Sequence, residues 1–78
     1  MATLRLFAQA REAAGTSTDE LPGCTVDEIL AGARARYGPA FGAVLDASRV
    51  WVNGEPAAGP DAVGASDEVA VLPPVSGG

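Results

Sequence analysis

The segment Thr25–Tyr37 most constrains the fold, because it carries a long helical repeat of apolar side chains. The apolar side chains recur at the spacing of a single stripe along a helix, at Val26, Ile29, Leu30, Ala33 and Tyr37. Thr25 and Glu28 fit a capping box at the start, and Gly38-Pro39 ends the segment. Since an apolar stripe must be buried against another element, we expect this helix to cover one face of a sheet.

Strand patterns flank this helix on both sides. In the first predicted strand, Ala2–Ala8, alternation places Leu4 and Leu6 on one face and Arg5 and Phe7 on the other. The further expected elements are a short helical turn at Gln9–Ala14, an edge strand at Thr16–Leu21, another helical turn at Pro39–Asp46, a hairpin of Arg49–Val52 and Glu55–Ala58 around Asn53-Gly54, and a last strand at Asp67–Leu72.

These elements predict an α+β fold in one domain, residues 1–72, followed by a tail, residues 73–78. The sheet is expected to be mixed, with about five strands, one main helix on one face and a short extra helical turn. The first and last strands are the best candidates for the middle of that sheet. Periodicity does not order the strands further.

Charge and composition disfavour several classes of partner and site. The chain has ten acidic residues against five arginines, a net charge of −5, and neither Lys nor His. This balance disfavours nucleic acid as a partner, and it either favours a protein with a basic docking surface or only keeps the protein in solution. One cysteine excludes a disulfide framework or a zinc cluster within one chain. No apolar run approaches the roughly 20 residues of a membrane span, and the start lacks an apolar signal core, so we expect a cytoplasmic protein without a membrane partner.

The C-terminal residues form a thin tail behind the last strand. Pro73 and Pro74 cannot donate ladder hydrogen bonds, so the sheet should stop at Leu72 and the chain should leave it extended. Gly77 and Gly78 have no Cβ and would fit a narrow slot. We interpret the Gly78 carboxylate as the working group of the protein. The alternative is an ordinary frayed terminus.

Three stretches of the chain resemble the MoaD family of sulfur-carrier proteins, the small subunits of molybdopterin synthase. They are Leu6-Phe7-Ala8-Gln9-Ala10-Arg11-Glu12-Ala13-Ala14-Gly15, Val52-Asn53-Gly54 and Asp67-Glu68-Val69-Ala70-Val71-Leu72-Pro73-Pro74-Val75-Ser76-Gly77-Gly78. The resemblance spans the chain and implies the ubiquitin-like β-grasp topology. Thiazole-forming carriers are similar at the terminus but usually lack the Arg11-Glu12 turn and the Pro-Pro step.

The resemblance implies that a MoeB-type adenylating enzyme uses ATP to activate the Gly78 carboxylate, which a sulfur donor protein then converts to a thiocarboxylate. The tail residues would insert into a MoaE-type large subunit, where sulfur passes to a cyclic pterin precursor; these residues are Pro73, Pro74, Val75, Ser76 and Gly77. The chain has no Gly-rich phosphate loop, Lys or His, so we expect it to bind no cofactor or metal and to leave ATP to its partner.

Four residues are candidates for the partner interface. With one long helix, one sheet face lacks a cover, and Phe7, Val71 and Leu72 would form a docking patch there unless they belong to the ordinary core. Arg11 either pairs across the interface or ends a solvated helix. We interpret Cys24 as an incidental thiol.

Other residues and other functions stay open. Trp51 is assigned to packing, and Asp67-Glu68 either steers a partner or only adds solubility. The competing functions are a sulfur carrier for cysteine or thiazole formation, a ubiquitin-like protein modifier, and a binding module with an inert tail.

Overall fold

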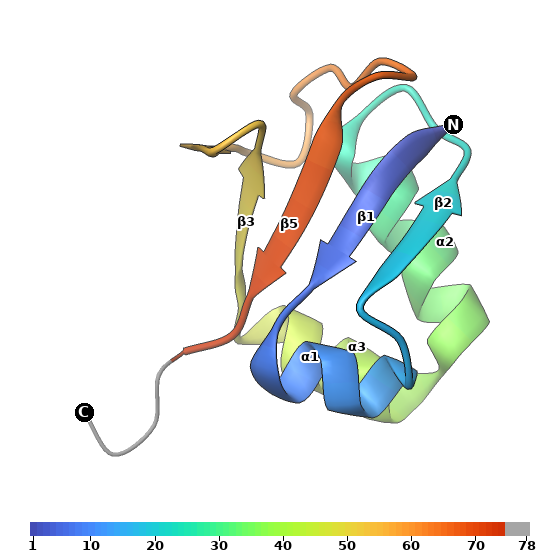
Figure 1. Cartoon of the computed structure of the whole chain (residues 1–78), viewed down its shortest axis with the longest axis vertical. Helices are drawn as coiled ribbons and strands as arrows, with labels where there is room; N and C mark the ends of the chain where they lie inside the picture. The colour runs from blue at the N-terminus through green and yellow to red at the C-terminus, as the bar shows by residue number, and fades with distance from the viewer. Residues whose placement is uncertain (75–78) are drawn as a thin grey trace.

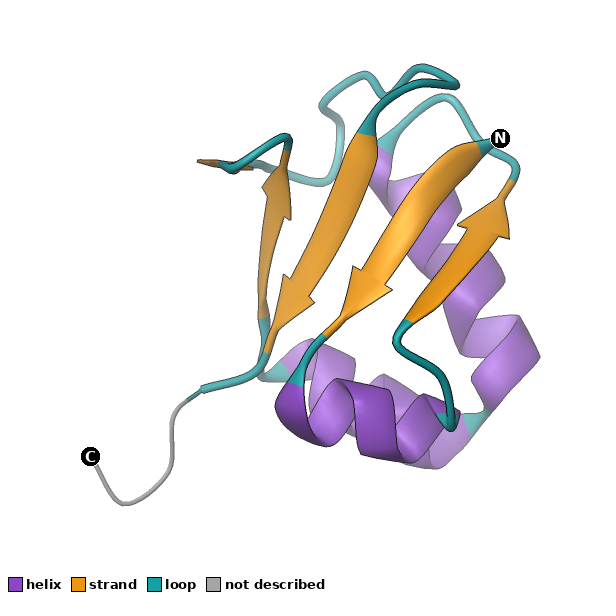
Figure 2. Cartoon of the chain, in the orientation of Figure 1, coloured by secondary structure: helices purple, strands orange, loops and turns teal. Residues whose placement is uncertain are grey.

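The computed structural model describes residues 1–74 of the chain. These residues form a mixed sheet with helices on one side (Figures 1 and 2). Val75, Ser76, Gly77 and Gly78, to which the sequence assigned the reactive end, lie outside these residues. The elements of residues 1–74 are β1 (Ala2–Leu6), α1 (Ala8–Ala14), β2 (Thr18–Leu21), α2 (Val26–Tyr37), α3 (Pro39–Asp46), β3 (Arg49–Val52), β4 (Glu55–Pro56) and β5 (Glu68–Leu72).

The strand order is β2-β1-β5-β3-β4, and β1 pairs with β5 in parallel while all other pairs are antiparallel. The first and last strands are therefore central neighbours, as expected, and β2 lies at an edge. This is the mixed β-grasp sheet that the resemblance implied. In Figure 1, α2 crosses behind the sheet, and α1 and α3 lie beyond its lower end. The sheet face toward the viewer carries no helix of residues 1–74.

The core lies between the sheet and the helices. Leu4 and Leu6 of β1 and Val69 of β5 have almost no exposed surface, and Ile29 of α2 and Phe41 of α3 are fully buried. Their burial follows from strand alternation and from the stripe on α2. No polar or charged side chain of residues 1–74 is buried. Among these residues, no helix combines the length and the apolarity that crossing a bilayer requires.

The first strand is shorter than the sequence predicted. β1 ends at Leu6 instead of Ala8, and Phe7 becomes the N-cap of α1 with extended backbone angles. Ala8 then has a φ of 49°, in the left-handed region that favours glycine. The chain thus turns abruptly from strand to helix, which moves Phe7 out of the regular sheet.

The N-terminus of α2 has a variant of the expected capping box. The Thr25 hydroxyl accepts a hydrogen bond from the Glu28 N–H at 3.2 Å, as predicted. The Glu28 carboxylate, however, accepts from the Cys24 N–H at 2.7 Å, one residue before the cap. Both bonds satisfy backbone donors at the point where the chain enters the helix.

The β3–β4 hairpin turns at Asn53-Gly54, as the sequence predicted. Both residues have positive φ, 51° and 83°, as a type I′ turn requires. The Asn53 side chain also accepts from the Glu68 N–H and donates to the Asp67 carboxylate, both at 2.9 Å. The returning strand is only Glu55–Pro56 and does not reach Ala58, the predicted end.

Candidate docking surface at the base of the tail

The sheet stops where the tail begins. Leu72 is the last residue of β5 and is paired with Arg49 of β3, which confirms the predicted end of the strand. Pro73, next in sequence, has no N–H to continue the ladder. Pro73 is half-buried and Pro74 is exposed. Pro73 and Pro74 are the described part of the predicted insertion segment, and they follow β5, whose arrow ends at the lower end of the sheet in Figure 1.

Alternation along β5 separates core residues from residues of the uncovered face. Val69 and Val71 are fully buried toward the helices. Glu68, Ala70 and Leu72 point to the opposite face and are half-buried. The interface prediction was therefore wrong for Val71, because a side chain without exposed surface cannot contact a partner. Leu72 is half-buried, so its side chain can still contact a partner.

A shallow hollow of about 310 Å³ lies on the uncovered face at the base of the tail. It is lined by Ala47, Arg49, Trp51, Leu72, Pro73 and Pro74. Five of these six side chains are apolar, and Arg49 alone brings a charge. The surface can therefore hold an apolar group beside an anion.

Sequence reasoning missed three residues of this hollow. Trp51 was assigned to packing, and Ala47 and Arg49 were not considered as site residues. A signal was present, because Arg49 and Trp51 alternate with Val50 and Val52 along β3. The antiparallel register of β3 then places Arg49 opposite Leu72 and Trp51 opposite Ala70.

Phe7 and Arg11 lie at the same end of the sheet. Leu6 pairs with Val71 in the parallel ladder, so the following residue, Phe7, reaches the end of β5. The Phe7 side chain is 41% exposed, which is unusual for a large apolar residue of this chain. Arg11 is exposed in the last turn of α1 and forms no ion pair with another residue of 1–74. Both side chains remain accessible, as the interface prediction requires.

The acidic pair Asp67-Glu68, where β5 begins, is engaged within the chain. The Asp67 carboxylate accepts from the Gly64 N–H at 2.8 Å and from the Asn53 amide at 2.9 Å. These hydrogen bonds lower the pKa of the Asp67 carboxyl below its ordinary value. Glu68 pairs with Arg5 of β1 at 3.4 Å on the uncovered face. Asp67 thus has a structural role in the loop before β5.

The remaining candidates lie elsewhere. Cys24 is exposed in the turn before α2, away from the hollow. No group of three or more Cys, Asp or Glu side chains among residues 1–74 is placed to hold a metal ion.

The hollow has the chemistry of a binding surface. Its lining contains no carboxylate, thiol, hydroxyl or imidazole that could act as an acid, base or nucleophile. It offers apolar contact and one guanidinium beside the start of the tail.

Known proteins share the fold of this chain. The model of the ThiS family matches residues 4–78. Small archaeal modifier protein 1 of Haloferax volcanii is 36% identical, with a TM-score of 0.83 over 99% of this chain and 98% of that one. The protein of the same name from Methanosarcina acetivorans is 32% identical, with a TM-score of 0.85 over 99% and 95%.

Two further solved structures are similar to this chain. A Pyrococcus furiosus protein described as subunit 1 of a molybdopterin converting factor is 26% identical, with a TM-score of 0.80 over 95% of this chain and 97% of that one. A chain of the BexX/CysO complex of Amycolatopsis orientalis is 25% identical, with a TM-score of 0.81 over the full length of both. No curated protein gives a significant match. Because the family model covers nearly all of the sequence, the chain belongs to the ThiS family of β-grasp sulfur carriers and ubiquitin-like modifiers.

Proposed function

We propose that this chain is the sulfur carrier of a molybdopterin synthase. The Gly78 carboxylate attacks the α-phosphorus of ATP on a MoeB-type enzyme, which releases pyrophosphate and leaves an acyl-adenylate. The persulfide of a donor protein then attacks the acyl carbon and displaces AMP, and a thiol reduces the S–S bond of the resulting acyl disulfide, so that the donor leaves and Gly78 ends in a thiocarboxylate. The tail inserts into a MoaE-type large subunit, where the sulfur passes to a cyclic pterin precursor.

The observation that carries this proposal is the continuity between tail and docking surface. Leu72 and Pro73 line the hollow on the uncovered face, and the tail starts from them. A partner that covers the hollow is therefore positioned to receive the tail in its own active site. Enclosure there would protect a thiocarboxylate from water. The Phe7-Ala8 and Arg11-Glu12 motifs, together with the Pro-Pro-Val-Ser-Gly-Gly terminus, favour molybdopterin synthase over the thiazole-forming carriers.

Identity to the two archaeal proteins favours a second candidate, a ubiquitin-like modifier. A modifier shares the activation step, but its acyl group ends on an amine of another protein. Because the sequence has no Lys, a second copy of this chain could accept the modifier only through its N-terminal amine. The two functions therefore differ in the acceptor. In the synthase a pterin precursor accepts sulfur from Gly78, whereas in the modifier an amine of another protein accepts the acyl group of Gly78.

The first test is activation of the tail. The full chain is incubated with the adenylating enzyme, ATP and a sulfur donor, and its intact mass is measured. We expect one oxygen to be replaced by sulfur at the C-terminus. A chain that lacks Gly78 is the control and should not change. An unaltered mass of the full chain would favour a binding module with an inert tail.

The second test separates the acceptors. The thiocarboxylated chain is offered the large subunit with a cyclic pterin precursor. Formation of molybdopterin and return of the carboxylate support the synthase. Covalent adducts on lysines of other proteins, without sulfur transfer to the pterin, would support the modifier instead.

A further inference from the structure

Arg49 has no carboxylate partner among residues 1–74. Three of the five arginines do have one: Arg5 pairs with Glu68 at 3.4 Å, Arg34 with Asp46 at 2.6 Å, and Arg36 with Asp19 at 3.0 Å. Arg49 is exposed on the uncovered face, opposite Leu72 and within the hollow. Its charge therefore has no counterpart within the described chain.

Two acidic residues, one close to Arg49 in sequence and one on the same face, already have partners. Asp46 precedes β3 and accepts from Arg34. Glu68 shares the uncovered face but pairs with Arg5. Although the whole chain carries a net charge of −5, the hollow at the base of the tail is locally positive.

An apolar hollow beside an unbalanced guanidinium is complementary to an apolar side chain beside a carboxylate. We propose that the adenylating partner presents such a pair, with the carboxylate on Arg49 and the apolar group between Trp51, Leu72 and Pro73. The inference rests on the proposed activation of Gly78. It differs from the expectation based on net charge alone, since the proposed partner surface at this point is acidic instead of basic.

Arg49 acts at the base of the tail, where the partner docks, and not at the Gly78 carboxylate, where the reaction takes place. Residues 73–78 separate Leu72 from the carboxylate, and a chain of that length reaches roughly 20 Å when extended. A tail extended in a slot would hold ATP far from Arg49, which lies opposite Leu72. Arg49 is therefore a positioning residue, and its loss should weaken binding of the chain while leaving the chemical step intact.

The test measures ATP–pyrophosphate exchange by the adenylating enzyme while the concentration of the full chain is varied. We expect Arg49→Gln to raise the KM for the chain about tenfold and Arg49→Glu to raise it further, with kcat unchanged. Arg49→Lys keeps the charge and should recover part of the affinity. Arg5→Gln is the matched control: it removes an arginine of the same face whose charge Glu68 already balances, and its KM should change about twofold at most.

Salt dependence and a charge swap complete the test. Raising the salt from about 0.1 M to about 1 M shortens the Debye length from about 10 Å to about 3 Å, so the difference between wild type and Arg49→Gln should shrink. Replacing the facing carboxylate of the partner by arginine should restore binding of Arg49→Glu. A KM for Arg49→Glu equal to or below that of wild type overturns the inference, as does a loss confined to kcat. No exchange with the wild-type chain refutes the proposed function, and this inference falls with it.

Discussion

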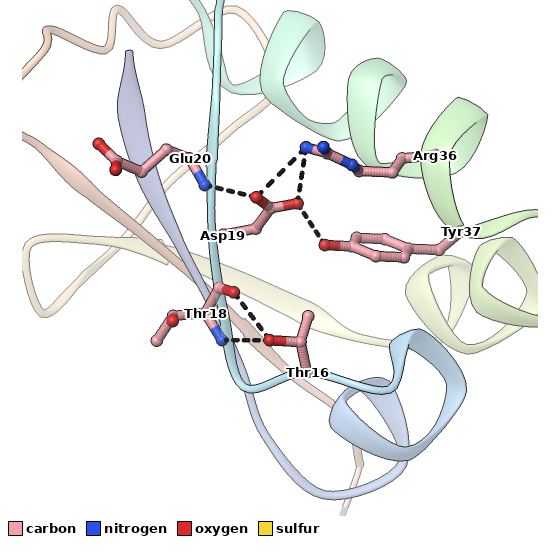
Figure 3. A network of polar contacts seen from close by, with 6 residues as sticks. All are labelled: Thr16, Thr18, Asp19, Glu20, Arg36 and Tyr37. Carbon is pink, nitrogen blue, oxygen red and sulfur yellow. Dashed lines mark hydrogen bonds and ion pairs between the residues drawn. The ribbon is translucent and has the colours of Figure 1, made fainter.

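The Tyr37 hydroxyl, in the last turn of α2, donates a hydrogen bond to the Asp19 carboxylate in the edge strand β2 (Figure 3). Arg36 donates to the same carboxylate at 3.0 Å, and the Glu20 N–H does so at 2.8 Å. This cluster joins the edge of the sheet to the end of the main helix. It lies on an edge strand, away from the hollow, so its loss should affect stability without altering partner binding.

Tyr37→Phe tests that contact. The variant keeps the aromatic ring, whose centroid lies 5.2 Å from that of Phe41, and removes only the donor. We expect the free energy of unfolding to fall by about 1 kcal/mol, the usual net value of a hydrogen bond. Urea unfolding followed by circular dichroism measures the loss. Unchanged stability would show that water replaces the hydroxyl at Asp19 without cost.

Stability should fall in acid because two carboxylates have depressed pKa values. The hydrogen bond from Tyr37 lowers the pKa of Asp19, and the bonds from Gly64 and Asn53 lower that of Asp67, both below the ordinary 3.8. A depressed folded-state pKa stabilises the fold above the unfolded value, and this contribution is lost as the pH falls through the folded value. The urea concentration at the midpoint of unfolding is measured between about pH 7 and about pH 2. We expect this concentration to fall once the pH is lower than about 4, where carboxylates become protonated. Asp67→Asn should flatten that drop.

Stability should also fall in strong alkali. Burial, together with the bond to Asp19, raises the pKa of Tyr37 from 10.0 to about 12. A raised folded-state pKa stabilises the fold below the unfolded value, and this contribution is lost as the pH rises from 10 toward 12. The phenolate absorbance of the single tyrosine reports the titration directly. A midpoint near 10 would contradict the contact in Figure 3.

Ala8→Gly should not destabilise the protein, unlike other alanine-to-glycine changes in its helices. Ala8 has a φ of 49°, which glycine adopts without steric cost, so relief of strain opposes the entropy gained by the unfolded chain. We expect a change in the free energy of unfolding between zero and about +1 kcal/mol. Ala35→Gly, at an exposed position of α2, is the control and should lose about 1 kcal/mol. Equal losses for both variants would contradict strain at Ala8.

Leu72→Arg should weaken partner binding and leave the fold intact, because Leu72 lines the hollow on the uncovered face. The KM for the chain in the exchange assay is the measure, and a rise of about tenfold or more is expected from placing a charge in an apolar contact. Thr18→Arg adds the same charge to an exposed position of β2, two strands away from β5, and should have little effect. Unaltered KM for Leu72→Arg would remove Leu72 from the interface.

Sequence and proposal together predict a strict requirement at the terminus. One residue added after Gly78, or Gly77→Val, should abolish thiocarboxylate formation, because a side chain or a displaced carboxylate no longer fits a slot made for two glycines. Thermal unfolding should match wild type, since neither change touches residues 1–74. Sulfur transfer by the extended chain at the normal rate would exclude Gly78 as the carrier group.

Much of the fold was predictable from local patterns. The stripe and capping box of α2, the Asn53-Gly54 turn and the stop at Pro73 each depend on residues close in sequence, so each could be predicted from sequence alone. The shorter β1 was not predictable in the same way. Its end depends on the positive φ of Ala8, a conformation that alanine adopts only when the surrounding structure imposes it.

The sequence alone thus determined the order of the elements and the end of the last strand before Pro73. Tertiary structure decided which side chains lie on the uncovered face of the sheet. Alternation along β5 places Val69 and Val71 on one face and Ala70 and Leu72 on the other. The parallel register of β5 with β1 then places Val69 and Val71 in the buried core. Pairing of β3 with β5 likewise brings Arg49 beside Leu72. The physical reason is that a strand repeats every two residues, so its pattern defines two faces, and only long-range pairing and the packed helices select the buried one.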